Sequence, residues 1–589
     1  MKQANKSEKF GSDVLADLVK AMGIEYVPLN PGASVRGIHD SFVNYGGNRK
    51  PELILCCHEE IAVAMASGYF RATGKPLLVL LHDLEGLFHA TKAIFDAWIQ
   101  KDAMILVGGN GPTDIEKRRP WIDWIHTALV PGLAVRDYVK WDDQPQGLRS
   151  AVESLIRAYR IASAPPEGPV YIALDVDLQE EPLKENFKIP SLEVYPAASF
   201  GEGSLEDLGR VSKMLVEAKQ PAIIVERYGI DDEAVGNLVT LAEETGSAII
   251  DNGARFNFPS DHPLNLSGAR EEILEQADLV LALGVTDLYH AVTKEESHFL
   301  RKVRRILKPE CQLIRIDLQS VNTRSWISDY GRLTPATMVV VAHPPTAVAK
   351  LVTLCRNEKL ASATKQNIKD RVSSLKEWHQ SLRKQWMEEA HSSRNQKPLS
   401  LASLAMLTWE LSKNRDWVLC FPGYTSGGIN MWIRRIWDIK RHYQYPGRGG
   451  GTGTGIGAAM GAALANKGKL CLDFQPDGDL LYTSSSLWTA AHHKIPLLVV
   501  MQNNHSYFND EEHQRSIAIQ RNRSVENRVI GIRLEDPNVD FAKLAESYGL
   551  VGFGPVDNAE AFENSFRDGI KVVMEDHRPC VIDALVQTH

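Results

Sequence analysis

The sequence lacks the features that would place it in a membrane or on an export route. No apolar stretch reaches 18 residues, so we expect no transmembrane helix and no membrane partner. The first twelve residues, MKQANKSEKFGS, contain no apolar core of the kind found in signal peptides. The seven cysteines are scattered and odd in number, and only Cys56 and Cys57 are neighbours, in a run that reads as an apolar strand. Reduced, buried thiols in a cytoplasmic protein are therefore expected.

The chain also lacks an excess of positive charge. Its formal net charge is −8, and the short basic runs at 117–119 and 434–435 are too small to change that balance. Nucleic acid is therefore not expected as a partner. No cysteine or histidine spacing suggests a zinc site.

The length and the order of elements indicate several α/β domains. At 589 residues, the chain is too long for one core, and three domains fit best. Short apolar runs that read as strands alternate with helical runs, which predicts doubly wound parallel sheets. We place the domains at 1–185, 199–360 and 398–589. A proline-bearing linker (182–198) and a charged, helix-like segment (364–396) separate them.

The most informative stretch runs from residue 473 to 509, DFQPDGDLLYTSSSLWTAAHHKIPLLVVMQNNHSYFN. It reads as strand, turn, helix, strand and turn, with Asp477 after the first strand and Asn504 after the second. Parallel strands end at the same edge of a sheet, so both side chains should emerge side by side in the crevice where such sheets bind ligands. Carboxylate, amide and carbonyl oxygens together with a diphosphate suit Mg²⁺ or Ca²⁺. The alternative is that Asp477 lies in an ordinary turn and Asn504 at an ordinary strand end, without a metal.

This spacing resembles the Gly-Asp-Gly…Asn-Asn motif of the thiamine diphosphate (ThDP)-dependent decarboxylase and acetolactate synthase superfamily. The resemblance extends over nearly the whole chain, although Pro476 replaces the first glycine of the motif. It implies three domains that bind the pyrimidine, form the centre and bind the diphosphate, with ThDP and Mg²⁺ as cofactors. The metal ligands would be Asp477, Asn504 and the backbone carbonyl of Ser506, and Gly478 and Asp479 would also border the cofactor.

On the pyrimidine side, the block HEEIAVAMASGYFRATGKP resembles the segment that carries the glutamate of the family. That role falls to Glu59, whose carboxylate would hydrogen-bond the pyrimidine ring, while Glu60 points elsewhere. A solvated glutamate pair at a helix start is the alternative. In this family the glutamate and the diphosphate site come from different subunits. The resemblance therefore implies a homodimer or homotetramer with active sites at the subunit interface.

On the diphosphate side, the motifs resemble benzoylformate decarboxylase more than other members. Thr425 and Ser426 match its phosphate-contacting pair, although an ordinary helix cap would look the same. Gly450 matches the glycine whose carbonyl meets the pyrimidine amino group. Two residues further on, the family has a bulky apolar side chain that supports bent ThDP, and this chain has Thr452. The usual support of the bent form is therefore reduced.

Two histidines and one missing serine bear on the substrate. His82, at a strand end, matches the histidine that faces the substrate in benzoylformate decarboxylase, and His290 resembles the second active-site histidine with a one-residue gap. Either could shuttle protons near neutral pH, and either could be a polar residue of no special role. Ala33 stands where the decarboxylase has a serine that binds the substrate carboxylate.

The resemblance implies non-oxidative decarboxylation of a 2-oxo acid or a related carbonyl compound. A carboligase or lyase of acetolactate synthase or 2-hydroxyacyl-CoA lyase type is the close alternative, and a ThDP-binding protein without turnover is a third. Some relatives hold FAD or an ADP moiety in the central domain, for which the sequence has no distinctive signature. The charged segment 507–540 is interpreted as a lid over the cofactor, with a solvated surface loop as the alternative.

Overall fold

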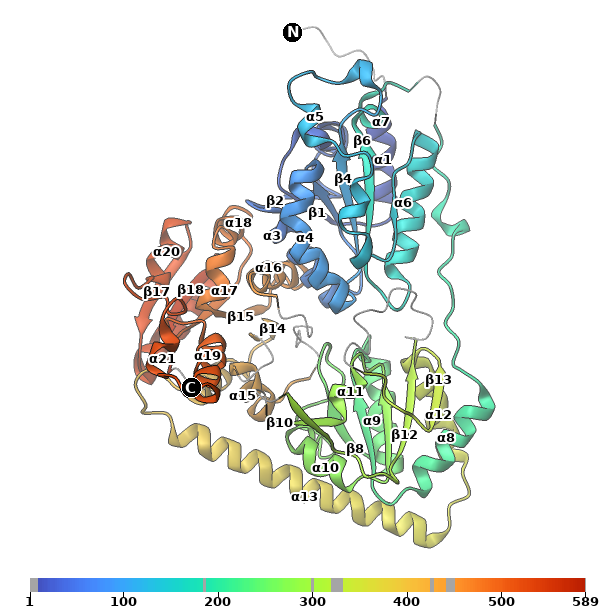
Figure 1. Ribbon diagram of the computed structural model, residues 1–589, viewed down its shortest axis with the longest axis vertical. Helices are drawn as coiled ribbons and strands as arrows, with labels where there is room; N and C mark the ends of the chain where they lie inside the picture. The colour runs from blue at the N-terminus through green and yellow to red at the C-terminus, as the bar shows by residue number, and fades with distance from the viewer. Residues whose placement is uncertain are drawn as a thin grey trace.

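The computed structural model describes residues 9–183, 187–297, 301–318, 332–423, 428–440 and 451–587. Three parallel sheets form three domains, each inside one of the ranges expected from the sequence. Figure 1 shows the first domain at the top, the central domain at the lower right and the third domain at the left. None of the helices in the described ranges combines the length and the apolarity needed to span a bilayer.

The first domain has a six-stranded parallel sheet in the order β2-β1-β3-β4-β6-β5. Its strands are β1 (Tyr26–Leu29), β2 (Glu52–Leu55), β3 (Leu78–Leu81), β4 (Met104–Asn110), β5 (Asp142–Asp143) and β6 (Pro169–Asp175). Its helices are α1 (Gly11–Ala21), α2 (Arg36–Asp40), α3 (Glu59–Thr73), α4 (Asp83–Gln100), α5 (Asp123–His126), α6 (Leu148–Ser163) and α7 (Val176–Glu180). Every residue of β1, β3, β4 and β6 is buried, as expected for a sheet covered on both faces.

The central domain has a five-stranded parallel sheet in the order β13-β12-β9-β7-β8. Its strands are β7 (Pro221–Val225), β8 (Ala248–Asp251), β9 (Leu279–Leu283), β12 (Gln312–Asp317) and β13 (Met338–Val341). Its helices are α8 (Leu205–Glu217), α9 (Asp232–Thr245), α10 (Arg270–Gln276), α11 (Leu288–Ala291) and α12 (Pro344–Asn357). An antiparallel hairpin of β10 (Thr293–Ser297) and β11 (Lys302–Arg305), which the sequence pattern did not predict, projects from it. The charged segment before the third domain forms α13 (Ser362–Ser392), a long helix along the lower edge of the molecule (Figure 1).

The third domain has a five-stranded parallel sheet in the order β14-β15-β16-β18-β17. Its strands are β14 (Trp417–Phe421), β15 (Leu470–Pro476), β16 (Leu498–Asn503), β17 (Val551–Val556) and β18 (Cys580–Leu585). Its helices are α14 (Leu401–Ser412), α15 (Ile429–Ile436), α16 (Gly455–Ala465), α17 (Asp477–Tyr482), α18 (Ser486–His492), α19 (Phe508–Gln520), α20 (Phe541–Ser547) and α21 (Ala559–Met574).

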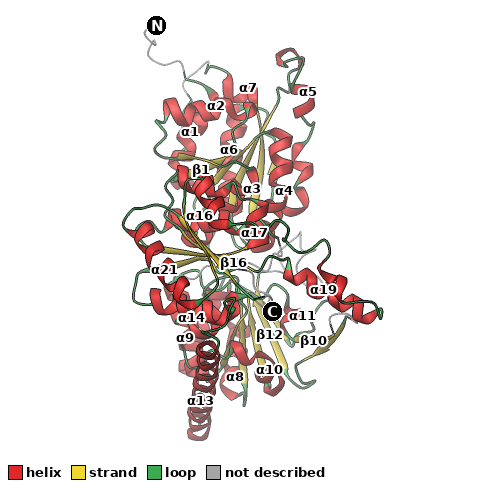
Figure 2. Cartoon of the chain, turned by 90° about the vertical axis from the view of Figure 1, so that its left-hand side faces the viewer, coloured by secondary structure: helices red, strands yellow, loops and turns green. Residues whose placement is uncertain are grey.

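The first and third domains meet where α3 packs lengthwise on α16, as both views show (Figures 1 and 2). The two backbones touch because glycines face the contact. A Cβ at Gly68 would lie 1.8 Å from the carbonyl oxygen of Ala458, and one at Gly461 would lie 2.0 Å from that of Met65. Within its described part, the glycine-rich run after residue 447 therefore forms a helix, α16, that packs closely on α3.

Two sequence predictions are wrong in detail. Strand β2 ends at Leu55, so Cys56 and Cys57 follow the strand, and Cys57 is exposed whereas Cys56 is buried. The residues after Pro476 were expected to form a turn, but α17 begins directly at Asp477. Two acidic side chains in its first turn, Asp477 and Asp479, are favourable at the positive end of a helix.

Candidate active site

The pyrimidine half of the site is built at the start of α3. His58 is the N-cap and its Nδ1 accepts the backbone N–H of Glu60 at 3.2 Å. Glu59, in the next position, is only 4% exposed, and its Oε2 lies 3.1 Å from Nδ1 of His89 on α4. Gly86 leaves room for this carboxylate, since a Cβ there would lie 3.0 Å from Oε1. The structure thus buries the carboxylate assigned to the pyrimidine and gives it a histidine partner.

The ligand atoms of His58, Glu59 and His89 lie within 4.8 Å of one another. Across the ranges that the structure describes, no other three His, Cys, Asp or Glu side chains gather as closely. The two imidazole rings are stacked, with centroids 4.9 Å apart. The positive end of α3 disfavours a cation at this point, so we interpret the cluster as support for the Glu59 carboxylate.

Glu60 points away from Glu59, as predicted, and toward the third domain. Its Oε1 lies 3.3 Å from Nζ of Lys92, which also lies 3.0 Å from Oδ2 of Asp96 and donates to the carbonyl of Thr452. A single ammonium group from α4 therefore connects the glutamate turn to the loop before α16. Thr452 is the residue predicted to border the pyrimidine, and this contact joins its loop to the glutamate turn of the same chain.

The substrate side of the first domain centres on His82, the residue before α4. Its Nδ1 lies 3.0 Å from Oγ of Ser34, and its ring meets that of His126 edge to face at 5.1 Å between centroids. Burial lowers the pKa of His82, and the neighbouring His126 lowers it further, which favours the neutral form of the ring. Ala33, the position of the missing serine, is exposed, whereas the next residue, Ser34, is buried.

The metal half of the site follows β15 and β16, which are neighbours in parallel register. Pro476 keeps an extended conformation (φ −65°, ψ 145°) and ends β15 without displacing Asp477. The carboxylate of Asp477 accepts the backbone N–H groups of Gly478 at 2.7 Å and Ser506 at 3.3 Å. Burial raises its pKa to about 6, and backbone N–H groups of residues 478 and 504–506 oppose that rise.

The two asparagines of the pair have different surroundings. Asn503 is fully buried and its side-chain N–H₂ donates to Oδ1 of Asp583 at 2.9 Å. Asn504 is half-buried, and its Oδ1 accepts the backbone N–H of Ser506 at 2.9 Å. Asn503 is therefore tied to the sheet, and Asn504 is the member of the pair whose amide oxygen lies beside Asp477.

These residues fit a hard divalent cation. Asp477 is a buried carboxylate surrounded by the main-chain N–H groups of residues 478 and 504–506. The amide oxygen of Asn504 lies next to this carboxylate. None of the hydrogen bonds described above uses the backbone carbonyl oxygen of Ser506. A cation here would favour the ionised carboxylate and would need further oxygen ligands, which the diphosphate of a cofactor would supply.

Gly478 and Asp479 follow Asp477 in the first turn of α17 and contact the residues around it. A Cβ at Gly478 would lie 2.4 Å from the Tyr507 ring, so the ring packs directly on this turn. Asp479 is buried and its Oδ1 accepts the backbone N–H of Gly453, where φ is +92°. Asp479 thus fixes the loop that carries Thr452, a supporting role beneath the cofactor position.

The remaining predicted residues lie in the central domain, in the segment after Asn504 or outside the described residues. His290 is exposed on α11 of the central domain, whereas His82 lies in the first domain. Thr425, Ser426 and Gly450 lie outside the described residues. The segment 507–540 contains α19 and a 3-10 helix (Glu526–Val529). Its end lies against the residues after Asn504, with Arg533 in an isolated β-bridge to Ser506 and Leu534 N–H donating to the carbonyl of His505 at 2.7 Å. The buried Glu511 on α19 accepts the hydroxyl of Ser506 at 2.6 Å.

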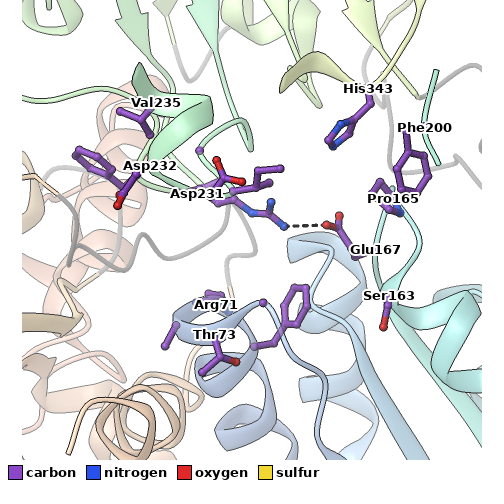
Figure 3. A pocket seen from close by; sticks show the side chains of 18 residues that line it. Arg71, Thr73, Ser163, Pro165, Glu167, Phe200, Asp231, Asp232, Val235 and His343 are labelled. Carbon is purple, nitrogen blue, oxygen red and sulfur yellow. Dashed lines mark hydrogen bonds and ion pairs between the residues drawn. The ribbon is translucent and has the colours of Figure 1, made fainter. Parts of the chain in front are cut away.

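A separate cavity of about 500 Å³ lies between the first and central domains. Figure 3 shows Glu167 of the first domain paired across it with an arginine, Arg255 of the central domain, at 3.4 Å, with His343 nearby. The cavity lies beyond the carboxyl ends of β7 and β8, the usual ligand edge of such sheets. It is the place in the central domain where a ligand would be sought.

Comparison with known proteins covers all three domains. Residues 10–129, 208–334 and 425–584 match the N-terminal TPP binding domain, the central domain and the C-terminal TPP binding domain of thiamine pyrophosphate enzymes. The chain belongs to the ThDP-dependent enzymes.

Two curated relatives of this ThDP-dependent enzyme are acetolactate synthases. The large subunit from Haemophilus influenzae is 25% identical, covering 92% of this chain and 89% of the relative. The enzyme from Bacillus subtilis is 23% identical over 100% of this chain and 95% of the relative. A solved structure, a ThDP-dependent 4-hydroxybenzoylformate decarboxylase from Rhodococcus jostii, superimposes with a TM-score of 0.75 at 20% identity, over 99% of this chain and 100% of that chain. The fold is shared, but the names of these relatives describe different reactions.

Proposed function

We propose that this ThDP-dependent enzyme catalyses non-oxidative decarboxylation of a 2-oxo acid, with Mg²⁺ at Asp477, Asn504 and the carbonyl of Ser506. The observation that carries the proposal is the half-buried His82, whose pKa is lowered by burial and by His126, at the same edge of the domain as the buried Glu59. Bound ThDP would supply a nucleophilic C2 and an electron sink for the broken carbon–carbon bond.

The residues of the chain would do the rest. Glu59 would hydrogen-bond the pyrimidine, and its burial and its contact with His89 keep the carboxylate in one orientation. His82 would hydrogen-bond the substrate and help to move a proton after CO₂ leaves. Asp479 and Lys92 would keep the loop at Thr452 close to the glutamate.

The test is incubation with ThDP, Mg²⁺ and a panel of aromatic and aliphatic 2-oxo acids, with CO₂ and products followed by mass spectrometry. His82→Ala should reduce the rate by roughly 10²–10⁴, the usual range for a positioned acid or base, without changing ThDP affinity. The absence of CO₂ at saturating cofactor would rule out the decarboxylase proposal.

A carboligase or lyase is the second candidate, because the curated relatives are acetolactate synthases and because Ala33 cannot bind a substrate carboxylate. The same assay distinguishes it. Formation of acetolactate from pyruvate would identify a carboligase. Cleavage of a 2-hydroxyacyl-CoA without CO₂ would identify a lyase, and inertness with every donor would favour a binding protein without turnover.

We also propose that two or four copies assemble around the active sites. The support is an exposed apolar surface on the segment that carries His126, where Trp121, Trp124 and Leu129 are 70%, 69% and 90% exposed. Monomeric proteins rarely expose such patches. Because His126 contacts His82, a second copy covering this surface would border the substrate side. The implication that two subunits each supply one half of a site stays a prediction.

Sedimentation analysis tests the assembly. Replacing Trp121 and Trp124 by serine should weaken self-association. Leu333→Ser, at an 82% exposed position in the central domain, is the matched control and should leave it unchanged. A wild-type protein that sediments as a monomer at micromolar concentration would refute the proposal.

A further inference from the structure

The turn at residues 30–34 packs closely against the ring of His82. Residues 30–34 approach the ring so closely that a Cβ at Gly32 would lie 2.2 Å from its Cγ. Ser34, in the same turn, is 4% exposed, and a Cβ at Gly109 on β4 would lie 2.3 Å from its Oγ. The hydroxyl of Ser34 therefore sits in a closed space against Nδ1 of His82.

The position of Ser34 is itself fixed. Its backbone carbonyl accepts a hydrogen bond from Nε2 of Gln179 at 2.9 Å, and Gln179 is fully buried on α7. Oε1 of Gln179 accepts the backbone N–H of Ile38 at 3.3 Å. This network ties the turn to α2 and α7, and Ser34 lies with its Oγ 3.0 Å from Nδ1 of His82.

The direction of that hydrogen bond follows from burial. A buried hydroxyl that cannot donate is costly, and among the described residues the one hydrogen-bond partner of the Ser34 hydroxyl is His82 Nδ1. Donation from Ser34 places a lone pair on Nδ1. In a neutral ring the proton then resides on Nε2.

We propose that Ser34 is the positioning residue of His82: its hydroxyl donates to Nδ1 and selects the tautomer whose Nε2–H is offered to an oxygen of the bound carbonyl substrate. This rests on the proposed function, in which His82 contacts the substrate. Ser34 would thus compensate for Ala33. With alanine at position 33, the carboxylate of the substrate has no serine partner there. The hydroxyl of Ser34 acts instead through the imidazole ring of His82.

The tautomer can be observed in the resting protein. In full-length protein labelled with ¹⁵N-histidine, two-bond ¹H–¹⁵N correlation spectra distinguish protonated from bare ring nitrogens, and His82→Gln identifies the signals of His82. We expect a protonated Nε2 and a bare Nδ1 in the wild type. In Ser34→Ala, we expect a mixture that includes the Nδ1–H form. A proton on Nδ1 in the wild type would overturn the proposal.

Ser41→Ala is the matched control. Ser41 is a buried serine of the same domain, 1% exposed, whose hydroxyl contacts Ser12 and Asp13. We expect Ser41→Ala to lower the stability of the protein about as much as Ser34→Ala does, and to leave the NMR signals of His82 unchanged. Equal changes of these signals in both variants would show that Ser34 acts through stability alone, which would also overturn the proposal.

Kinetics give a second readout on the loaded enzyme. Ser34→Ala should reduce kcat/KM for the 2-oxo acid by roughly 10-fold, less than the 10²–10³ lost with a direct transition-state donor, while ThDP affinity stays unchanged. Failure of the proposed decarboxylation would appear as an inactive wild type whose His82 tautomer still responds to Ser34. An unaltered tautomer in Ser34→Ala with an active wild type would reject the positioning role alone.

Discussion

The two halves of the active site are held in different ways. The first-domain half depends on side chains from separate elements: Glu59 with His89, and His82 with Ser34. The third-domain half is a main-chain structure, in which consecutive backbone N–H groups surround Asp477. A main-chain site tolerates a change such as Pro476 for glycine because only the backbone path must be kept. A side-chain site can change its partners one residue at a time, which makes it the part in which related enzymes can differ.

The largest effect is expected when the main-chain half loses the carboxylate assigned to the metal, Asp477. Asp477→Ala should weaken Mg²⁺-dependent ThDP binding by more than about 100-fold, because even the outer partners of metal ligands typically contribute 10–100-fold. Isothermal titration calorimetry with ThDP, at fixed Mg²⁺ and in its absence, measures this. An unchanged affinity would show that the metal lies elsewhere.

The asparagine pair supplies the control for this half. Asn503→Ala removes a buried bond to Asp583 and should lower the melting temperature while the Mg²⁺ response is retained. Asn504→Ala should have the opposite profile, with a weaker Mg²⁺ response and little loss of stability.

In the side-chain half, the comparison is between adjacent glutamates. Glu59→Gln should bind ThDP but lose about 10²–10⁴ in the rate of hydrogen–deuterium exchange at C2, since a neutral amide cannot favour the required tautomer of the pyrimidine. Glu60→Gln, which alters only the ion pair with Lys92, should exchange at nearly the wild-type rate. If the two variants behaved in reverse, Glu60 would hold the role assigned to Glu59.

Much of the fold follows from the sequence, because buried parallel strands are short apolar runs bounded by turn residues. β1 is the apolar run Tyr26–Leu29, and α3 ends at Gly74, a residue suited to the left-handed conformation that it adopts there (φ +70°). The hairpin of β10 and β11 has no apolar alternation, so periodicity could not reveal it. The start of α17 was hidden because Gly478 favours a turn.

The parts of the site that the sequence did not predict are tertiary contacts. Ser34 is adjacent to the position where a serine was sought, but only the turn geometry shows that its hydroxyl reaches His82. His89 could have been found, because His82, Gly86 and His89 recur at i, i+4 and i+7 on one face of a helix. The Glu59 position was predicted from its flanking motif, and the structure adds the burial and the partner that a motif does not contain.

The contact between the halves can be broken without touching either set of ligands. Gly461→Ala places a Cβ 2.0 Å from the carbonyl oxygen of Met65, so the two helices must separate. Overpacking of this kind costs about 1–3 kcal/mol or more, measured by urea denaturation, and ThDP affinity should fall with it. Gly209→Ala, at a helical position with no atom within 4 Å, should instead stabilise the protein by about 0.5–1 kcal/mol. A stable Gly461→Ala variant with normal ThDP affinity would show that the two halves do not depend on this packing.

The smallest effect concerns Asp83, the residue after His82 and the start of the side-chain half. It is 3% exposed, its φ is +45°, and its Oδ1 accepts the backbone N–H of Leu84 at 2.8 Å. Burial raises its pKa to about 7, and Asp123 and Glu85 raise it further, against the bond from Leu84. The folded state thus holds the proton more tightly than the unfolded chain, where the pKa is near 3.8.

The contribution of Asp83 to stability is therefore complete below about pH 4 and is lost as the pH rises through 7. Asp83→Asn cannot ionise, keeps an oxygen for the Leu84 N–H, and tolerates the left-handed backbone. The variant should be more stable than the wild type at pH 8 by about 1–2 kcal/mol and nearly equal to it at pH 4.5. Urea denaturation at the two pH values measures the difference. A constant difference between wild type and Asp83→Asn across this range would mean that the carboxyl is ionised in the folded protein, and that the edge around His82 is more polar than its burial indicates.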